Sequence, residues 1–189
     1  MVFVESTLSI VAATMAVIFL AEIGDKTMIS TALFAAQTRK YVQVLFASTL
    51  AFALANVLPI YAGHILRFYV SANALRIAAV ALFIAIGVWM LLSSEEHEKR
   101  VAAGILACFL VVLLSEIGDK TQLAALSMSI MSGSPIAVLV GSVLGYLSAN
   151  VLGVLLVGSL SKVVAWSKIK KASAIIMIVV GVLLALSVV

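Results

Sequence analysis

The chain has 189 residues, of which 65% are apolar and 11% are charged, and its net charge is +4. A soluble domain carries about 25% charged residues, so this composition excludes an ordinary soluble enzyme. It predicts a helical membrane protein whose partner is the lipid bilayer. The basic residues lie in short segments between apolar runs, which argues against nucleic acid as a partner. The one cysteine, Cys108, excludes an internal disulfide and a thiolate metal site.

Six apolar runs are separated by short polar segments. They predict membrane-spanning helices near residues 6–37, 42–64, 73–92, 101–131, 136–160 and 172–189. The first and fourth runs have about 30 residues, or roughly 45 Å as a straight helix, against a hydrocarbon core of about 30 Å. Each of these two runs has a glycine near its middle, Gly24 or Gly118. We therefore expect both to form tilted or broken helices.

The first half of the sequence is repeated in the second half. Residues 22–27, Glu-Ile-Gly-Asp-Lys-Thr, recur unchanged as residues 116–121, which is 94 positions later. The same offset relates three further pairs: Ser48 and Ser142, Asn56 and Asn150, and Gly87 and Gly181. The repeat unit contains three spans. We predict one repeat at residues 1–94 and a second at 101–189, joined by a linker at 95–100.

An odd number of spans per repeat requires the two repeats to insert in opposite orientations. The loops after the first, third and fifth spans carry eight Lys and Arg residues, whereas those after the second and fourth carry only Arg67 and Arg76. By the positive-inside rule, the loops at 38–41, 93–100 and 161–171 are cytoplasmic and both termini face outward. We predict an all-α, multi-pass protein of the inner (plasma) membrane with two inverted three-helix repeats. Such proteins bind substrate at the repeat interface near the midplane.

Each copy of the motif places two carboxylates three residues apart, on one face of a helix: Glu22 with Asp25, and Glu116 with Asp119. Acids at bilayer depth cost several kcal/mol and usually handle ions, protons or substrate. Hard divalent cations such as Ca²⁺ and Mn²⁺ take oxygen ligands. We predict that the four carboxylates converge on one cation, at least in an occluded state.

Other polar residues of the repeat are candidates for a supporting role. Asn56 and Asn150 can add amide oxygens, although interhelical hydrogen bonding explains such residues equally well. The motif itself supplies four more candidates: Lys26, Lys120, Thr27 and Thr121. Weaker candidates, because their counterparts are of another type, are Ser115, Gln122 and Thr49.

The charges of the motif suggest a mechanism. The four carboxylates and two lysines have a net charge of −2, which one divalent cation or two protons would neutralise. Carboxylates crowded in a low dielectric hold protons more readily than isolated ones. Metal and protons then compete for one site, and this competition is the basis of antiport. The lysines are expected to pair with the acids when no cation is bound.

Two copies of Glu-x-Gly-Asp-Lys-Thr in a chain of six short spans resemble the Gdt-type cation/proton exchangers, the second calcium:cation antiporter family, whose bacterial members include manganese exporters. The resemblance covers essentially the whole chain. It implies transport of Mn²⁺ or Ca²⁺ out of the cytoplasm against protons, with no prosthetic group. The acids that bind the ion would be Glu22, Asp25, Glu116 and Asp119.

Other functions are weighed against this one. Asp25 and Asp119 suggest an intramembrane aspartyl protease, but residues 23–25 lack the first glycine of the Gly-x-Gly-Asp motif that such enzymes resemble. A passive cation channel predicts oligomeric rings of acids, and an exporter of a cationic metabolite such as lysine predicts an aromatic lining. We favour a transporter that is not an enzyme, with Mn²⁺ first and Ca²⁺ second. The sequence leaves open H⁺ or Na⁺ coupling, and also the oligomeric state, a homo-oligomer included.

Overall fold

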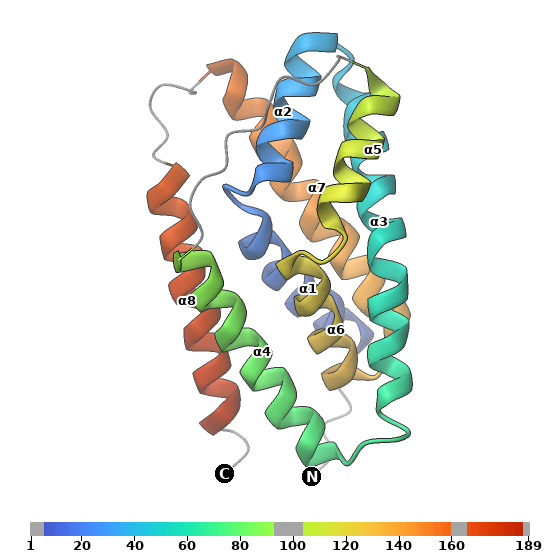
Figure 1. Ribbon diagram of the computed structural model, residues 1–189, viewed down its shortest axis with the longest axis vertical. Helices are drawn as coiled ribbons and strands as arrows, with labels where there is room; N and C mark the ends of the chain where they lie inside the picture. The colour runs from blue at the N-terminus through green and yellow to red at the C-terminus, as the bar shows by residue number, and fades with distance from the viewer. Residues whose placement is uncertain (1–5, 93–103, 160–165, 187–189) are drawn as a thin grey trace.

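The computed structural model describes residues 6–92, 104–159 and 166–186. Within these ranges the chain is all helical, as the sequence predicts (Figure 1). The helices are α1 (Thr7–Glu22), α2 (Lys26–Thr38), α3 (Tyr41–Leu66), α4 (Ala72–Leu92), α5 (Ile105–Glu116), α6 (Lys120–Ser132), α7 (Pro135–Ser159) and α8 (Trp166–Leu186). The predicted linker at 95–100 lies outside the described residues, as does the 161–165 part of the third predicted cytoplasmic loop.

Three helices are long and apolar enough to cross a membrane by themselves. They are α3, most of α4 (Asn73–Leu92) and most of α7 (Pro135–Leu156). The pair α1 and α2 makes a fourth candidate, bent by 77° at its break. Shorter apolar helices are α5 and the segment Lys171–Leu183 of α8. The structure therefore confirms a helical protein with several candidate membrane spans.

Each of the two long predicted spans is a pair of helices broken inside the motif. Gly24 has φ 72° and Gly118 has φ 80°, a left-handed conformation that glycine adopts without steric cost. The preceding residues, Ile23 and Ile117, are extended, with ψ of 123° and 118°. The break is therefore a property of the repeated sequence, because the same turn interrupts an apolar run in both halves.

The two halves run in opposite directions. In Figure 1, α1 and α2 rise from bottom to top whereas α5 and α6 descend, and α3 and α7 are antiparallel, as are α4 and α8. The broken helices of each half pack on a helix of the other half. The helices α1 and α2 pack on α7, and α5 and α6 pack on α3. The central bundle is thus built from helix pairs that correspond under the 94-residue offset.

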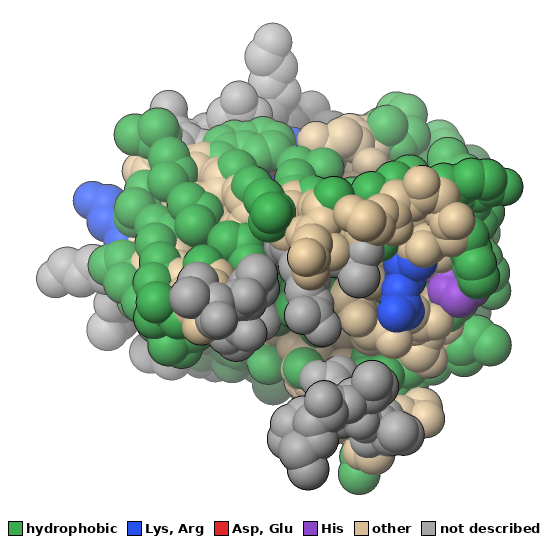
Figure 2. Space-filling view, turned by 90° about the horizontal axis from the view of Figure 1, so that it is seen from below, with side chains coloured by type: hydrophobic (Ala, Val, Ile, Leu, Met, Phe, Trp, Pro, Cys, Tyr) green, Lys and Arg blue, Asp and Glu red, His purple; other side chains and the backbone are tan. Residues whose placement is uncertain are grey.

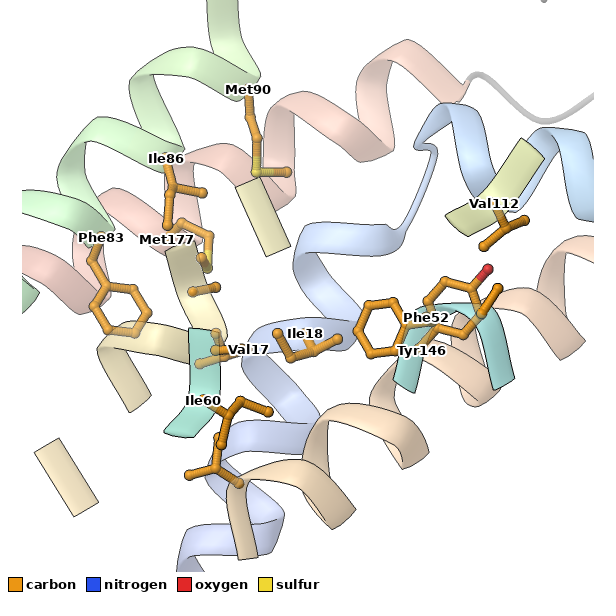
Figure 3. Packing of buried hydrophobic residues seen from close by; sticks show 14 of the residues in the cluster. Val17, Ile18, Phe52, Ile60, Phe83, Ile86, Met90, Val112, Tyr146 and Met177 are labelled. Carbon is orange, nitrogen blue, oxygen red and sulfur yellow. The ribbon is translucent and has the colours of Figure 1, made fainter. Parts of the chain in front are cut away.

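One cluster of buried apolar residues holds the helices together (Figure 3). At the centre of the bundle, Phe52 of α3 stacks on Tyr146 of α7, and Ile18 of α1 packs beside them. The cluster extends to α4 and α8, where Phe83 and Met177 are fully buried. It contributes to the packing of α3 against α7 and of α4 against α8, and each of these contacts joins a helix to its own counterpart.

Candidate cation site

The two broken helices meet through a cluster of aspartates and one lysine. Lys120 forms an ion pair with Asp25 of the other half, and its Nζ lies 3.2 Å from Oδ2 of Asp119. Asp25 and Asp119 are each 8% exposed, and Lys120 is 5% exposed. Lys26 Nζ is farther away, 3.9 Å from Oδ1 of Asp119. Pairing between the motif lysines and acids is therefore present, and it joins the two halves.

Both aspartates lie where a helix begins after the break in the motif. Asp25 and Asp119 are the N-cap residues of α2 and α6, yet neither carboxylate accepts a capping hydrogen bond from a backbone N–H. Instead, Oδ2 of Asp25 accepts from Oγ1 of Thr27 at 3.4 Å, and Oδ2 of Asp119 accepts from Nζ of Lys120. The N-terminus of a helix carries positive partial charge, which favours a carboxylate there. Both carboxylates thus sit at a favourable helix end while their oxygens are available to lysine or to a cation.

The glutamates have different partners. Glu22 and Glu116 are the last residues of α1 and α5, and both are completely buried. Oε2 of Glu22 accepts a hydrogen bond from Oγ1 of Thr27 at 3.0 Å, and Oε2 of Glu116 accepts one from Oγ1 of Thr121 at 2.8 Å. The other oxygen, Oε1, has no hydrogen-bond partner in either residue. Leaving such a buried oxygen without a donor is costly.

The two asparagines show the same pattern on α3 and α7. Nδ2 of Asn56 donates to the carbonyl of Phe52 at 3.0 Å, and Nδ2 of Asn150 donates to the carbonyl of Tyr146 at 2.9 Å. Both asparagines are completely buried, and Oδ1 of each has no partner. With the nitrogen held by the backbone one turn earlier, each amide presents only its oxygen to the interior.

The structure does not gather the four acids into one group. Among the residues it describes, no three Asp, Glu, His or Cys side chains lie close enough together to hold a metal ion. Lys120 contacts both aspartates, and each glutamate accepts from a threonine. Thr27 also reaches Oδ2 of Asp25, at 3.4 Å. Glu22 is nevertheless within electrostatic range of Glu116, Asp25 and Asp119. Convergence of all four carboxylates in an occluded state stays a prediction.

Sequence reasoning gave too little weight to Gln122. Its Oε1 accepts from the backbone N–H of Gly118 at 3.0 Å, and its Nε2 donates to the carbonyl of Ala55 at 2.8 Å. It therefore ties the α5–α6 break to α3. The counterpart of Gln122 is Met28, so the α1–α2 break lacks this tie. The difference in type made Gln122 a weak candidate for a symmetric site, but it suits a role that only one half needs.

Sequence reasoning missed Tyr146 altogether. Its side chain is completely buried, and its hydroxyl is within electrostatic range of both Glu116 and Glu22. The 94-residue offset relates it to Phe52, so the pair was visible in the sequence as two large aromatic residues at equivalent positions. An aromatic stripe on a membrane helix is usually ordinary packing, which is why the pair did not stand out.

A family model described as "Divalent cation/proton antiporter GDT1" matches residues 10–98 and again 104–189. The chain belongs to this family. The resemblance noted from the motifs is thereby confirmed, and each of the two GDT1 matches contains one copy of Glu-Ile-Gly-Asp-Lys-Thr.

One curated relative of this GDT1 family member comes from Vibrio cholerae serotype O1 (strain ATCC 39541 / Classical Ogawa 395 / O395), where it is described as "Putative manganese exporter". It is 31% identical over 123 residues, which is 64% of this chain and 62% of the relative. The match thus covers less than two thirds of the relative's length. No solved structure matches the chain.

Proposed function

We propose that this chain exchanges a divalent cation for protons across a membrane, with Mn²⁺ as the preferred cation and Ca²⁺ as the second candidate. The observation that carries the proposal is a set of four buried oxygens without a hydrogen-bond donor. They are Oε1 of Glu22 and Glu116 and Oδ1 of Asn56 and Asn150. All are acceptors, and they occupy equivalent positions of the two halves. A bound cation supplies what each of them lacks.

The residue types favour a hard cation. Carboxylate and amide oxygens suit Ca²⁺ and Mn²⁺, whereas zinc and copper prefer sites that include histidine or cysteine. Mg²⁺ dehydrates reluctantly and is seldom held by an all-protein cage. Ligand chemistry does not separate Mn²⁺ from Ca²⁺. The preference for Mn²⁺, and for export, rests on what the Vibrio relative is described to do.

Proton exchange is supported by the charge of the motif residues. Four carboxylates and two lysines leave a net charge of −2, which two protons or one divalent cation neutralise. In the structure, Lys120 already offsets part of this charge by lying between Asp25 and Asp119. A cation that binds must compete with this lysine, and protons must compete with the cation for Glu22 and Glu116.

We further propose six spans arranged as two inverted repeats, residues 1–94 and 101–189, with the site at their interface. The opposite chain directions in Figure 1 and the exchange of packing partners support this arrangement. The positive-inside rule supports an orientation with both termini outside and loops 38–41, 93–100 and 161–171 in the cytoplasm. Gly24 and Gly118 then interrupt two different membrane helices, which enter the bilayer from opposite sides.

Uptake into proteoliposomes under an imposed pH gradient tests the function. We expect uptake of Mn²⁺ and, less efficiently, Ca²⁺, with little uptake of Mg²⁺ or Zn²⁺. Asp25→Ala and Asp119→Ala should abolish it. Ser148→Ala is a matched control on α7, since the Ser148 hydroxyl bonds only to Leu144 O of its own helix. Normal transport by both aspartate variants, or no metal uptake by the wild type, would overturn the proposal.

Metal content of cells separates the two candidate cations. Cells that lack the protein should accumulate manganese and become sensitive to it, and expression should reverse both effects. Unchanged manganese with altered calcium handling would instead assign a Ca²⁺/H⁺ exchanger. Sensitivity to zinc or copper alone would show that the argument from oxygen ligands is wrong.

A further inference from the structure

The two copies of the motif have identical sequences but different surroundings. The Lys120 side chain is 6% exposed and contacts both aspartates, whereas the Lys26 side chain is 34% exposed and reaches only Asp119. Gly118 is exposed and Gly24 is buried. Because the six residues are the same in both copies, these differences reflect how the rest of the protein packs around each copy.

The helices α4 and α8 form a tightly interlocked pair. A Cβ added at Gly87 would lie 2.5 Å from Cγ1 of Ile178, and one added at Gly181 would lie 2.8 Å from Cγ1 of Ile84. Ile84 and Ile178 are themselves separated by the 94-residue offset, so the contact is nearly symmetric. Backbones this close move together, and we treat α4 and α8 as one unit, the α4–α8 pair.

This symmetric pair is packed asymmetrically on the rest of the molecule. It contacts the central bundle through α4 on α6 and α8 on α1. The 94-residue offset relates these two contacts to α8 on α2 and α4 on α5. Within the described residues, neither of those helix pairs is packed to a similar extent. In Figure 1 the pair lies beside the lower half of the bundle, next to α1 and α6.

The exposure of α2 and α6, though not that of α1 and α5, follows this asymmetry. No residue of α6 is exposed, whereas its counterpart α2 exposes Leu33, Ala36 and Gln37. Ile117, at the α5–α6 break, is 63% exposed, and its counterpart Ile23 is only partly exposed. Seen from below in Figure 2, no Asp or Glu side chain is visible among the described residues. Around the motif, α6 is thus more covered than α2, and the α5–α6 break is more exposed than the α1–α2 break.

We propose that Lys26 and Lys120 are positioning residues that alternate between two states of the protein. In the state described, Lys120 lies between Asp25 and Asp119, and the α4–α8 pair covers α1 and α6. In the second state, Lys26 takes that place and the α4–α8 pair covers α5 and α2. The proposal rests on the proposed function, since it identifies how that site changes its access from one side to the other.

Each lysine then stabilises one state over the other. Replacing Lys120 with glutamine leaves the two aspartates without their cation in the described state only, so the population shifts to the second state. Replacing Lys26 has the opposite effect. The two substitutions are a matched pair in identical sequence surroundings, so a general effect of losing a motif lysine would act on both in the same direction.

Accessibility of the two breaks measures these populations. In a Cys108→Ala background, Ile23→Cys or Ile117→Cys is introduced, and the protein in liposomes is treated on both sides with a membrane-impermeant maleimide. We expect Ile117→Cys to react faster than Ile23→Cys. Lys120→Gln should change the ratio of the Ile117→Cys rate to the Ile23→Cys rate by about tenfold, so that Ile23→Cys becomes the faster of the two. Lys26→Gln should increase it, and Lys120→Arg should retain it.

The result that overturns the proposal is equal labelling at the two positions, or a ratio that Lys120→Gln and Lys26→Gln change in the same direction or leave unchanged. If Lys120→Gln fails to fold, Lys26→Gln carries the test, because its side chain is partly exposed. Labelling requires no metal flux. A protein that fails to transport Mn²⁺ can still show the predicted ratios, so the two proposals fail separately.

Discussion

Phe52 and Tyr146 occupy equivalent positions in the two halves and stack on each other, with ring centroids 4.2 Å apart and planes inclined by 21°. A residue that contacts its own counterpart lies at the boundary between the halves. Asn56 and Asn150 bond to the carbonyls of these two aromatic residues, one turn further along α3 and α7. The stack therefore sets the positions of two of the four unpaired oxygens.

Asn56→Leu and Asn150→Leu separate a ligand from a structural hydrogen bond. Each amide oxygen is buried without a partner, so removing it should cost little stability. We expect transport of Mn²⁺ to fall strongly while the thermal unfolding temperature in detergent stays close to that of the wild type. Large losses of stability with normal transport by the folded fraction would instead show that the asparagines only join helices.

Thr27→Val and Thr121→Val test the support of the glutamates. Each threonine hydroxyl donates to Oε2 of Glu22 or Glu116 and so fixes the orientation of the carboxylate. Losing a residue that orients a metal ligand typically costs about 10–100-fold in affinity. We expect a rise of that order in the Mn²⁺ concentration for half-maximal uptake. Thr→Ser at the same positions keeps the hydroxyl and should restore most of the affinity, and a Ser variant as poor as Val would contradict this role.

The sequence predicted the helices well because the repeat fixes them. The breaks at Gly24 and Gly118 follow from apolar runs that are too long to cross a membrane straight and that contain the one residue suited to a left-handed turn. The bounds of α3, α4 and α7 lie within a residue or two of the apolar runs that predicted them.

The arrangement of the acids could not be predicted in the same way. Lys26 and Lys120 lie in identical six-residue motifs, so the motif alone does not indicate that Lys120 lies between the aspartates and Lys26 does not. The difference arises outside the motif, where Gln122 ties one break to α3 and its counterpart Met28 does not.

Gly118→Ala tests whether the break requires glycine. A Cβ at Gly118 would meet no atom within 4 Å, so the only cost is the left-handed backbone, about 1–2 kcal/mol. We expect a lower unfolding temperature and reduced transport. Gly104→Ala is the control, because φ there is 174° and the added Cβ would lie 4.0 Å from Cβ of Ala107. Equal effects of the two substitutions would show that the left-handed turn is not needed.

We predict that one divalent cation and two protons replace each other at the site. The most direct test is simultaneous measurement of Mn²⁺ and proton fluxes in proteoliposomes, with the membrane potential clamped at several values. We expect about two protons to move per Mn²⁺ in the opposite direction, at a rate that does not depend on the potential, and both fluxes to be lost in Glu116→Gln. Mn²⁺ entry that follows the membrane potential without proton movement would contradict it.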